Sequence, residues 1–143
     1  MNRMPIRSKQ ILAISLALTA LIPVVTFAAE VRSGNDASYL KNETIKDALY
    51  LIGGSVTSSG ALRGDLITFG GNILINGTVI GDIAAGGGNI SVLSDVHDDI
   101  RAAGGTVVVQ GAVGGDEIVA GGKVTIAGPK VGGDVSAAGG VVR

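Results

Sequence analysis

Apolar residues follow two regular spacings along this chain from Ile45 onward. Within a short run they alternate with polar or small residues, and equivalent positions in successive runs recur at a nearly constant step. One such column contains Leu66, Ile83, Ile100, Glu117 and Val135. Alternation with a period of two indicates β-strands, whereas a helix needs apolar residues about every 3.6 positions. The pattern therefore predicts one short-stranded unit that is repeated along the chain.

Glycine pairs and aspartates mark the corners of the repeat. The step between successive pairs is the same four times and then one position longer, and an aspartate stands at a fixed distance before each of the last five pairs. The pairs are Gly53-Gly54, Gly70-Gly71, Gly87-Gly88, Gly104-Gly105, Gly121-Gly122 and Gly139-Gly140, and the aspartates are Asp65, Asp82, Asp99, Asp116 and Asp134. Corners need tight bends and often a positive φ, which glycine adopts at little steric cost. We therefore interpret these glycines and aspartates as structural corner residues.

These observations predict an all-β fold, a three-sided parallel β-helix (β-solenoid) with coils of about 17 residues. Each coil would hold about three short strands, and inward side chains would stack on their equivalents at the inter-strand spacing of about 4.8 Å. We assign residues 45–143 to the repeat domain, about five and a half coils, and residues 29–44 to a linker or N-terminal cap. The chain stops at Arg143 in mid-coil, so we also consider a repeat domain that is truncated at its C-terminus.

Glu117 is a charged residue in an otherwise apolar inward column. One interpretation is a locally bulged coil, helped by the extra residue near Lys130. The other is an irregularity that serves a function. We favour the bulge.

Residues 1–28 have the layout of an export signal. Three basic residues precede an apolar stretch from Ile11 to Val25, and Thr26-Phe27-Ala28 offers small residues at −3 and −1 for cleavage after Ala28. This layout is typical of a secretory signal peptide. The alternative is an uncleaved membrane-anchor helix, because the uncharged stretch 10–29 is about long enough to span a bilayer. In either case we expect export to the cell envelope, as a periplasmic, extracellular or membrane-anchored protein.

Composition excludes several classes of protein. The 24 glycines lack the three-residue period of collagen, and regularly placed Val, Ile, Leu and Ala argue against disorder. The chain has no cysteine, which excludes disulfides and thiol nucleophiles. Without residues 1–28 it has 8 basic and 12 acidic residues, a net charge of −4, which argues against nucleic acid as a partner. No glycine is followed by Lys-Ser or Lys-Thr, so a phosphate-binding loop is absent and we predict no cofactor.

The aspartate column is the strongest candidate for chemistry. Stacked coils would align these carboxylates, and neighbours would repel by about 1 kcal/mol per pair at high dielectric. We favour a turn device in which each carboxylate accepts backbone N–H groups at its own corner. The alternatives are a ladder that binds cations and paired carboxylates for glycoside hydrolysis. A glycosidase would need a cleft that stacks on sugar, and the repeats offer only Phe69 and Tyr50 as aromatic residues.

The segment Asp95–Asp99 contains the only histidine of the chain. It is also the unit in which the usual Gly-Asp becomes Asp98-Asp99. Alternation directs Val96 inward and His97 outward, so we favour a solvated corner over a weak divalent-cation site. We predict no catalytic residue and no metal ligand.

The stretches Gly64–Val79 and Gly115–Gly128 resemble the repeats of polymer-forming cytoskeletal proteins, the bactofilin-like family. The resemblance covers residues 45–143, about two thirds of the chain. It implies a β-helix that polymerises end to end without nucleotide, often near a membrane, as a scaffold. Members of that family are cytoplasmic, whereas this chain carries an export signal.

On this basis we expect a non-enzymatic structural protein of the bacterial cell envelope. It would form a homopolymer by end-to-end stacking, because an uncapped solenoid end is a template for another strand layer. One alternative is an exported surface module that binds glycan or peptidoglycan through outward Thr, Asn, Ser and Lys side chains. Another is a β-helix enzyme that acts on polysaccharide. A membrane and cell-wall glycan are the further partners we consider.

Overall fold

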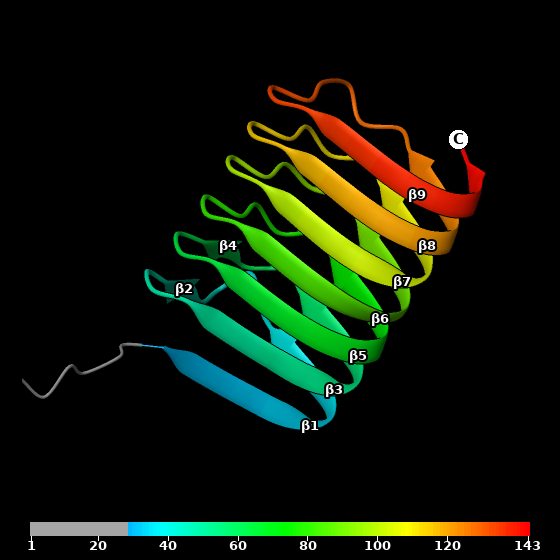
Figure 1. Ribbon diagram of the computed structural model, residues 1–143. Helices are drawn as coiled ribbons and strands as arrows, with labels where there is room; N and C mark the ends of the chain where they lie inside the picture. The colour runs from blue at the N-terminus through cyan, green and yellow to red at the C-terminus, as the bar shows by residue number, and fades with distance from the viewer. Residues whose placement is uncertain (1–28) are drawn as a thin grey trace, which may run out of the picture.

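The polypeptide winds into a stack of coils in the computed structural model, which describes residues 29–143 (Figure 1). This part of the chain contains nine strands and no helix. The strands are β1 (Glu30–Tyr39), β2 (Thr44–Ile45), β3 (Leu49–Ser58), β4 (Ala61–Leu62), β5 (Leu66–Ile75), β6 (Ile83–Val92), β7 (Ile100–Val109), β8 (Glu117–Ile126) and β9 (Val135–Val142).

Seven long strands form one parallel sheet in the order β1-β3-β5-β6-β7-β8-β9. Each is paired with the strand of the next coil, so that Leu66 lies beside Ile83 and Ile83 beside Ile100. A narrower ladder continues from the β2–β4 pair through parallel bridges between equivalent residues of the later coils. These residues are Leu62, Val79, Val96, Val113 and Val131. The predicted parallel β-solenoid, with the coil length that the sequence repeat indicated, is thereby confirmed.

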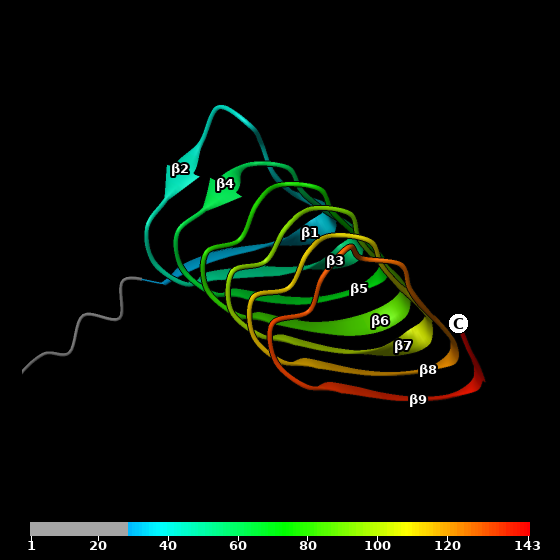
Figure 2. The same cartoon turned by 90° about the horizontal axis from the view of Figure 1, so that it is seen from above.

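The long strands from β3 to β9 bend at their glycine pairs, and Figure 2 shows the resulting coils stacked around a common interior. In β6 the first arm directs Ile83 and Ala85 inward, and the second arm directs Ile90 and Val92 inward. The alternation changes phase at Gly87-Gly88 because the chain turns a corner there. The narrow ladder adds one inward valine or leucine per coil from the third side.

The interior is narrow and is filled by aliphatic side chains that stack on their equivalents. Leu49, Leu66, Ile83 and Ile100 form one such column, and all four are fully buried. Full burial of an aliphatic side chain stabilises the fold by about 1.5–3 kcal/mol. Phe69, in contrast, is 51% exposed on the outside of the coil.

The solenoid begins earlier than the sequence predicted. Residues 29–44, expected to be a linker or N-terminal cap, contain β1, which pairs with β3 over nearly its whole length. The step from Gly34 to Gly53 is two positions longer than the step from Gly53 to Gly70, which conceals the repeat. The sheet therefore has seven layers, whereas we expected five and a half coils. Tyr39 is fully buried in this first coil.

The predicted signal peptide or membrane-anchor helix at residues 1–28 lies outside the described residues. Within residues 29–143, no helix has the length and apolar character needed to cross a membrane. Cleavage after Ala28 and export therefore stay predictions.

Candidate functional site

The predicted corner glycines lie at the bend of each long strand and stack on one another. The stacked pairs run from Gly53-Gly54 through Gly70-Gly71, Gly87-Gly88, Gly104-Gly105 and Gly121-Gly122 to Gly139-Gly140. None of the described glycines has a positive φ, so the expected positive φ was wrong. The preceding coil lies too close for a side chain, because a Cβ on Gly104 would be 2.7 Å from the carbonyl oxygen of Gly87. Close stacking of backbones, rather than backbone conformation, requires glycine here.

The predicted corner aspartates form a ladder of hydrogen bonds along one edge of the solenoid. Oδ1 of Asp65 accepts the backbone N–H of Asp82 at 3.0 Å, and Oδ1 of Asp82 accepts that of Asp99 at 2.9 Å. Asp99 accepts from Asp116 at 2.8 Å, and Asp116 accepts from Asp134 at 2.9 Å. Each of these four carboxylates therefore accepts a backbone N–H, as we expected, but the donor belongs to the next coil and not to its own corner.

The residue before a ladder aspartate is usually glycine because the carboxylate of the preceding coil fills the space beside it. A Cβ on Gly81 would collide with Oδ1 of Asp65, and a Cβ on Gly115 with Oδ1 of Asp99. Asp98 is the exception, and the hydrogen bond to the N–H of Asp99 is nevertheless formed. The Gly-Asp dipeptide is thus a device that holds one coil on the next.

Arg101 offsets part of the repulsion along the ladder. Its Nη2 lies 2.8 Å from Oδ2 of Asp99, and its Nη1 lies 3.5 Å from Oδ2 of Asp82. The side chains of Arg101 and Asp82 are about half exposed and that of Asp99 is partly exposed, so each pair contributes at most about 1 kcal/mol. Asp134 is the last aspartate of the ladder in the described chain.

Residues 29–143 contain no group of three or more His, Cys, Asp or Glu side chains that could hold a metal ion. His97 is exposed and Val96 is buried, as the alternation predicted. Oδ1 of Asp95 accepts the backbone N–H of Ala112 at 2.9 Å, so this corner also stacks on the next coil through an aspartate.

The N-terminal end of the solenoid is closed by charged side chains. Arg32 occupies an inward column of β1, and its Nε donates to Oε1 of Glu30 at 2.7 Å. Its Nη2 lies 2.6 Å from Oε2 of Glu43, and its guanidinium lies 5.8 Å from the ring centroid of Tyr39. The close contact with the Glu43 carboxylate is the main reason why the pKa of Arg32 is raised. These charged side chains form a lid that separates the interior from solvent at the N-terminal end.

The C-terminal end exposes the interior instead. Every residue of β9 is exposed, and Val135 and Val142, which lie in inward columns, are 51% and 47% exposed. One edge of β9 pairs with β8, and the backbone groups of the other edge have no strand partner in the described chain. In the described chain, β9 therefore presents an apolar surface bordered by an unpaired strand edge.

Glu117 lies one coil before this open end. It pairs in regular register with Ile100 and Val135, so the expected bulge is wrong and the carboxyl points into the core. The extra residue is accommodated in the loop between Ile126 and Val131. Glu117 is fully buried, and neither of its carboxyl oxygens has a hydrogen-bond partner. Burial raises the pKa of Glu117.

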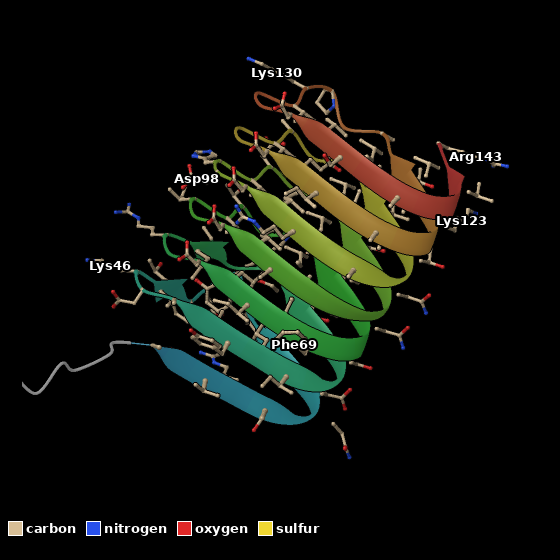
Figure 3. All side chains as sticks on the ribbon, viewed as in Figure 1. Lys46, Phe69, Asp98, Lys123, Lys130 and Arg143 are labelled. Atoms are coloured by element: carbon tan, nitrogen blue, oxygen red, sulfur yellow. The ribbon has the colours of Figure 1, made fainter. Side chains whose placement is uncertain are left out.

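The two arms of the long strands present different outer surfaces. The arms before the glycine pairs carry mainly apolar outward residues, and we call this surface the apolar face. Its residues are Tyr50, Ile52, Ile67, Phe69, Ala84, Ala103, Ile118 and Ala120, with Arg101 among them. Figure 3 shows Phe69 on this broad surface. Our sequence reasoning missed the apolar face, although alternation already placed Ile52, Phe69 and Ile118 outward.

The arms after the glycine pairs form a second surface, the polar face. Its outward residues include Ser55, Thr57, Asn72, Asn89, Ser91, Thr106, Lys123 and Thr125. Nδ2 of Asn89 donates to Oδ1 of Asn72 at 2.9 Å, and this bond links side chains of successive coils. A shallow hollow of about 240 Å³ lies over these residues.

Comparisons with protein-family models, with curated proteins and with solved structures found no match to this chain. The geometry of the ends and faces is therefore the basis for any functional conclusion.

Proposed function

We propose that this chain is a non-enzymatic structural protein of the bacterial cell envelope, a bactofilin-like scaffold that self-associates by end-to-end stacking of its solenoid. The observation that carries the proposal is the open C-terminal end formed by β9. A free strand edge beside exposed aliphatic side chains is the arrangement through which one sheet extends into another. Such a role needs no catalytic group, and the ladder carboxylates already serve to join coils.

The two ends differ in what they offer a second copy. At the C-terminal end, stacking removes Val135 and Val142 from water and pairs the free edge of β9. At the N-terminal end, Arg32 and its carboxylate partners occupy the interior, so an apolar surface is not available there. The first contact between two copies is therefore expected between their C-terminal ends, and growth of a homopolymer needs a further contact.

Export belongs to the same proposal because residues 1–28 have the layout of a signal peptide or membrane anchor. A membrane anchor would hold the scaffold at the membrane, and a cleaved signal peptide would release it. Sequencing the N-terminus of the mature protein distinguishes the two, since a signal peptide predicts a start at Ala29.

Sedimentation and electron microscopy of the expressed full chain test the stacking. We expect concentration-dependent assemblies for the wild type and their loss in V135D/V142D, because two carboxylates would then lie in the contact. I80D/L93D is the matched control: Ile80 and Leu93 are exposed aliphatic residues outside both β9 and the apolar face, at 40% and 44% exposure. A wild type that stays monomeric at high concentration contradicts the proposal, as does an equal effect of I80D/L93D.

A second candidate function is an exported module that binds glycan or peptidoglycan, and the polar face favours it. Hydroxyl and amide side chains line its hollow, among them Ser55, Asn72 and Asn89, and such groups can hydrogen-bond sugar hydroxyls. Co-sedimentation with insoluble peptidoglycan tests this role. Binding should be lost in N72A/N89A and kept in V135D/V142D, whereas no retention of the wild type would rule it out.

A further inference from the structure

The apolar face is unusual for the outer surface of a solenoid because large aliphatic and aromatic groups stand on it without a cover. Ile52, Phe69 and Ile118 are 46%, 51% and 47% exposed, and they come from three different coils. The first arms therefore present apolar residues along most of the stack. A contiguous apolar surface of this kind marks an interaction site.

The apolar face carries both a protruding group and a hollow. The hollow has a volume of about 280 Å³ and lies between Phe69 and Ile118, lined by alanines of β6, β7 and β8 and by Arg101. A cavity of about 150 Å³ is enough to hold a benzene molecule, so the hollow accepts one aromatic ring. A ring seated there would also meet the Arg101 guanidinium, a contact that cations and aromatic faces favour.

The charge around the apolar face argues against a bilayer as the occupant. The aspartate ladder follows one border of the face along the coils, because each ladder aspartate directly precedes a first arm. Arg101 is the one basic side chain on the face within the described chain, and it is already paired with Asp82 and Asp99. An anionic lipid surface would be repelled by this border.

The size of the apolar face fits a contact between two copies. Seven strands at about 4.8 Å and arms of about five residues at about 3.3 Å give roughly 500 Å² per copy. Two such faces bury roughly 1,000 Å², which is the lower limit for a specific protein interface. Phe69 and the hollow lie on the same face, so a two-fold axis near β6 lets each copy place its ring in the hollow of the other.

We propose that the apolar face is a lateral interface between two copies of this chain, in which Phe69 of each copy enters the hollow of the other. This contact extends the proposed self-association but does not depend on the open end. It also supplies the further contact that a homopolymer needs, since the N-terminal end of the solenoid is closed.

Single-cysteine cross-linking of the full chain tests the interface, because the native sequence contains no cysteine. Ala84 on β6 lies near the expected two-fold axis, so A84C should form a disulfide-linked dimer on mild oxidation. S91C is the matched control: Ser91 is also half-buried on β6 but lies on the polar face. We expect the S91C dimer to be at least about tenfold less abundant.

Two double variants separate the lateral contact from the end contact. A84C/F69D should lose the dimer at least about tenfold, because an aspartate would enter an apolar hollow. Circular dichroism should show that it is folded, since Phe69 is half exposed in the wild type. A84C/V142D should keep the dimer even where larger assemblies are lost.

Three results would overturn the lateral interface. They are no A84C dimer, an A84C dimer that is unaffected by F69D, and suppression of the dimer by phosphatidylcholine/phosphatidylglycerol vesicles that also shield the introduced thiol from a maleimide. The last result would identify a bilayer as the occupant. None of the three bears on the effect of V135D/V142D, so the end contact is judged separately.

Discussion

Replacing Glu117 with isoleucine should make the solenoid more stable, although substitution of a buried residue usually destabilises a protein. Isoleucine occupies the same column in the two preceding coils, and both Ile83 and Ile100 are fully buried. The site therefore has the shape of an aliphatic position. It is filled by a carboxyl group whose two oxygens have no hydrogen-bond partner.

The size of the effect follows from two contributions. A buried polar group without a hydrogen bond costs about 1–3 kcal/mol, and that cost is removed. A fully buried isoleucine side chain stabilises the fold by about 1.5–3 kcal/mol, and imperfect packing reduces this gain by about 1 kcal/mol. E117I should therefore raise the free energy of unfolding by about 1.5–5 kcal/mol.

Urea denaturation followed by circular dichroism measures this difference at pH 7. The midpoint should rise while the slope stays constant, because the surface exposed on unfolding hardly changes. D98N serves as a surface control and should stay within about 0.5 kcal/mol, since Asp98 is exposed. I100E, which places a carboxyl one coil deeper, should destabilise by about 3–5 kcal/mol. An E117I variant that is no more stable than the wild type would refute the buried, unpaired carboxyl.

The pH dependence of the folding stability tests the same Glu117 carboxyl in a second way. Burial raises the pKa of Glu117, so the folded chain keeps its proton at pH values where the unfolded chain has lost it. The wild type therefore loses stability as the pH rises above about 4.3, the usual pKa of glutamate, and the loss ends above the raised value. E117Q removes this titration. Its stability relative to the wild type should increase with pH above about 4.3, and a constant difference would contradict the assignment.

Three further substitutions test the contacts that hold the coils together, by the same denaturation assay. D99A removes the acceptor for the N–H of Asp116 and should cost about 1 kcal/mol, whereas D99N keeps an acceptor oxygen and should restore most of the loss. G104A places a Cβ against the carbonyl of Gly87 and should cost about 1–3 kcal/mol, whereas G34A, whose Cβ has 3.9 Å of clearance, should change stability by less than about 0.5 kcal/mol. R32A opens the N-terminal lid and should cost about 1 kcal/mol, and K46A, at an exposed lysine, should be neutral.

The residues of the interior could be predicted because each inward column repeats similar apolar side chains. Leu66, Ile83 and Ile100 recur at a fixed step, and only a stack of equal coils brings such residues together. Periodicity also located the corners at the glycine pairs. It could not give the reason for glycine there, because the approach of Gly87 to Gly104 is a contact between coils rather than a local property of the chain.

Features at the ends were harder to predict because they break the repeat. The longer step after Gly34 concealed β1, and Asn35 follows Gly34 where the later pairs have a second glycine. The carboxylate of Asp65 was expected to bind at its own corner, since turn chemistry describes only local donors. The structure shows that the donor is Asp82, one full coil away. The apolar face was harder to predict, because alternation shows which residues point outward but not that the apolar ones gather on one surface.

Stability along the solenoid is uneven, and this unevenness supports our proposal that a second copy binds at β9. In a stack of coils each layer is held mainly by its two neighbours, so a terminal layer is held on one side only. At the N-terminal end, β1 compensates with the contacts of Arg32 and with the buried Tyr39 ring. At the C-terminal end, β9 rests on a coil that carries Glu117, and its own valines face solvent. A second copy that covers β9 supplies the missing neighbour, so the end that is weakest in one copy gains most from association.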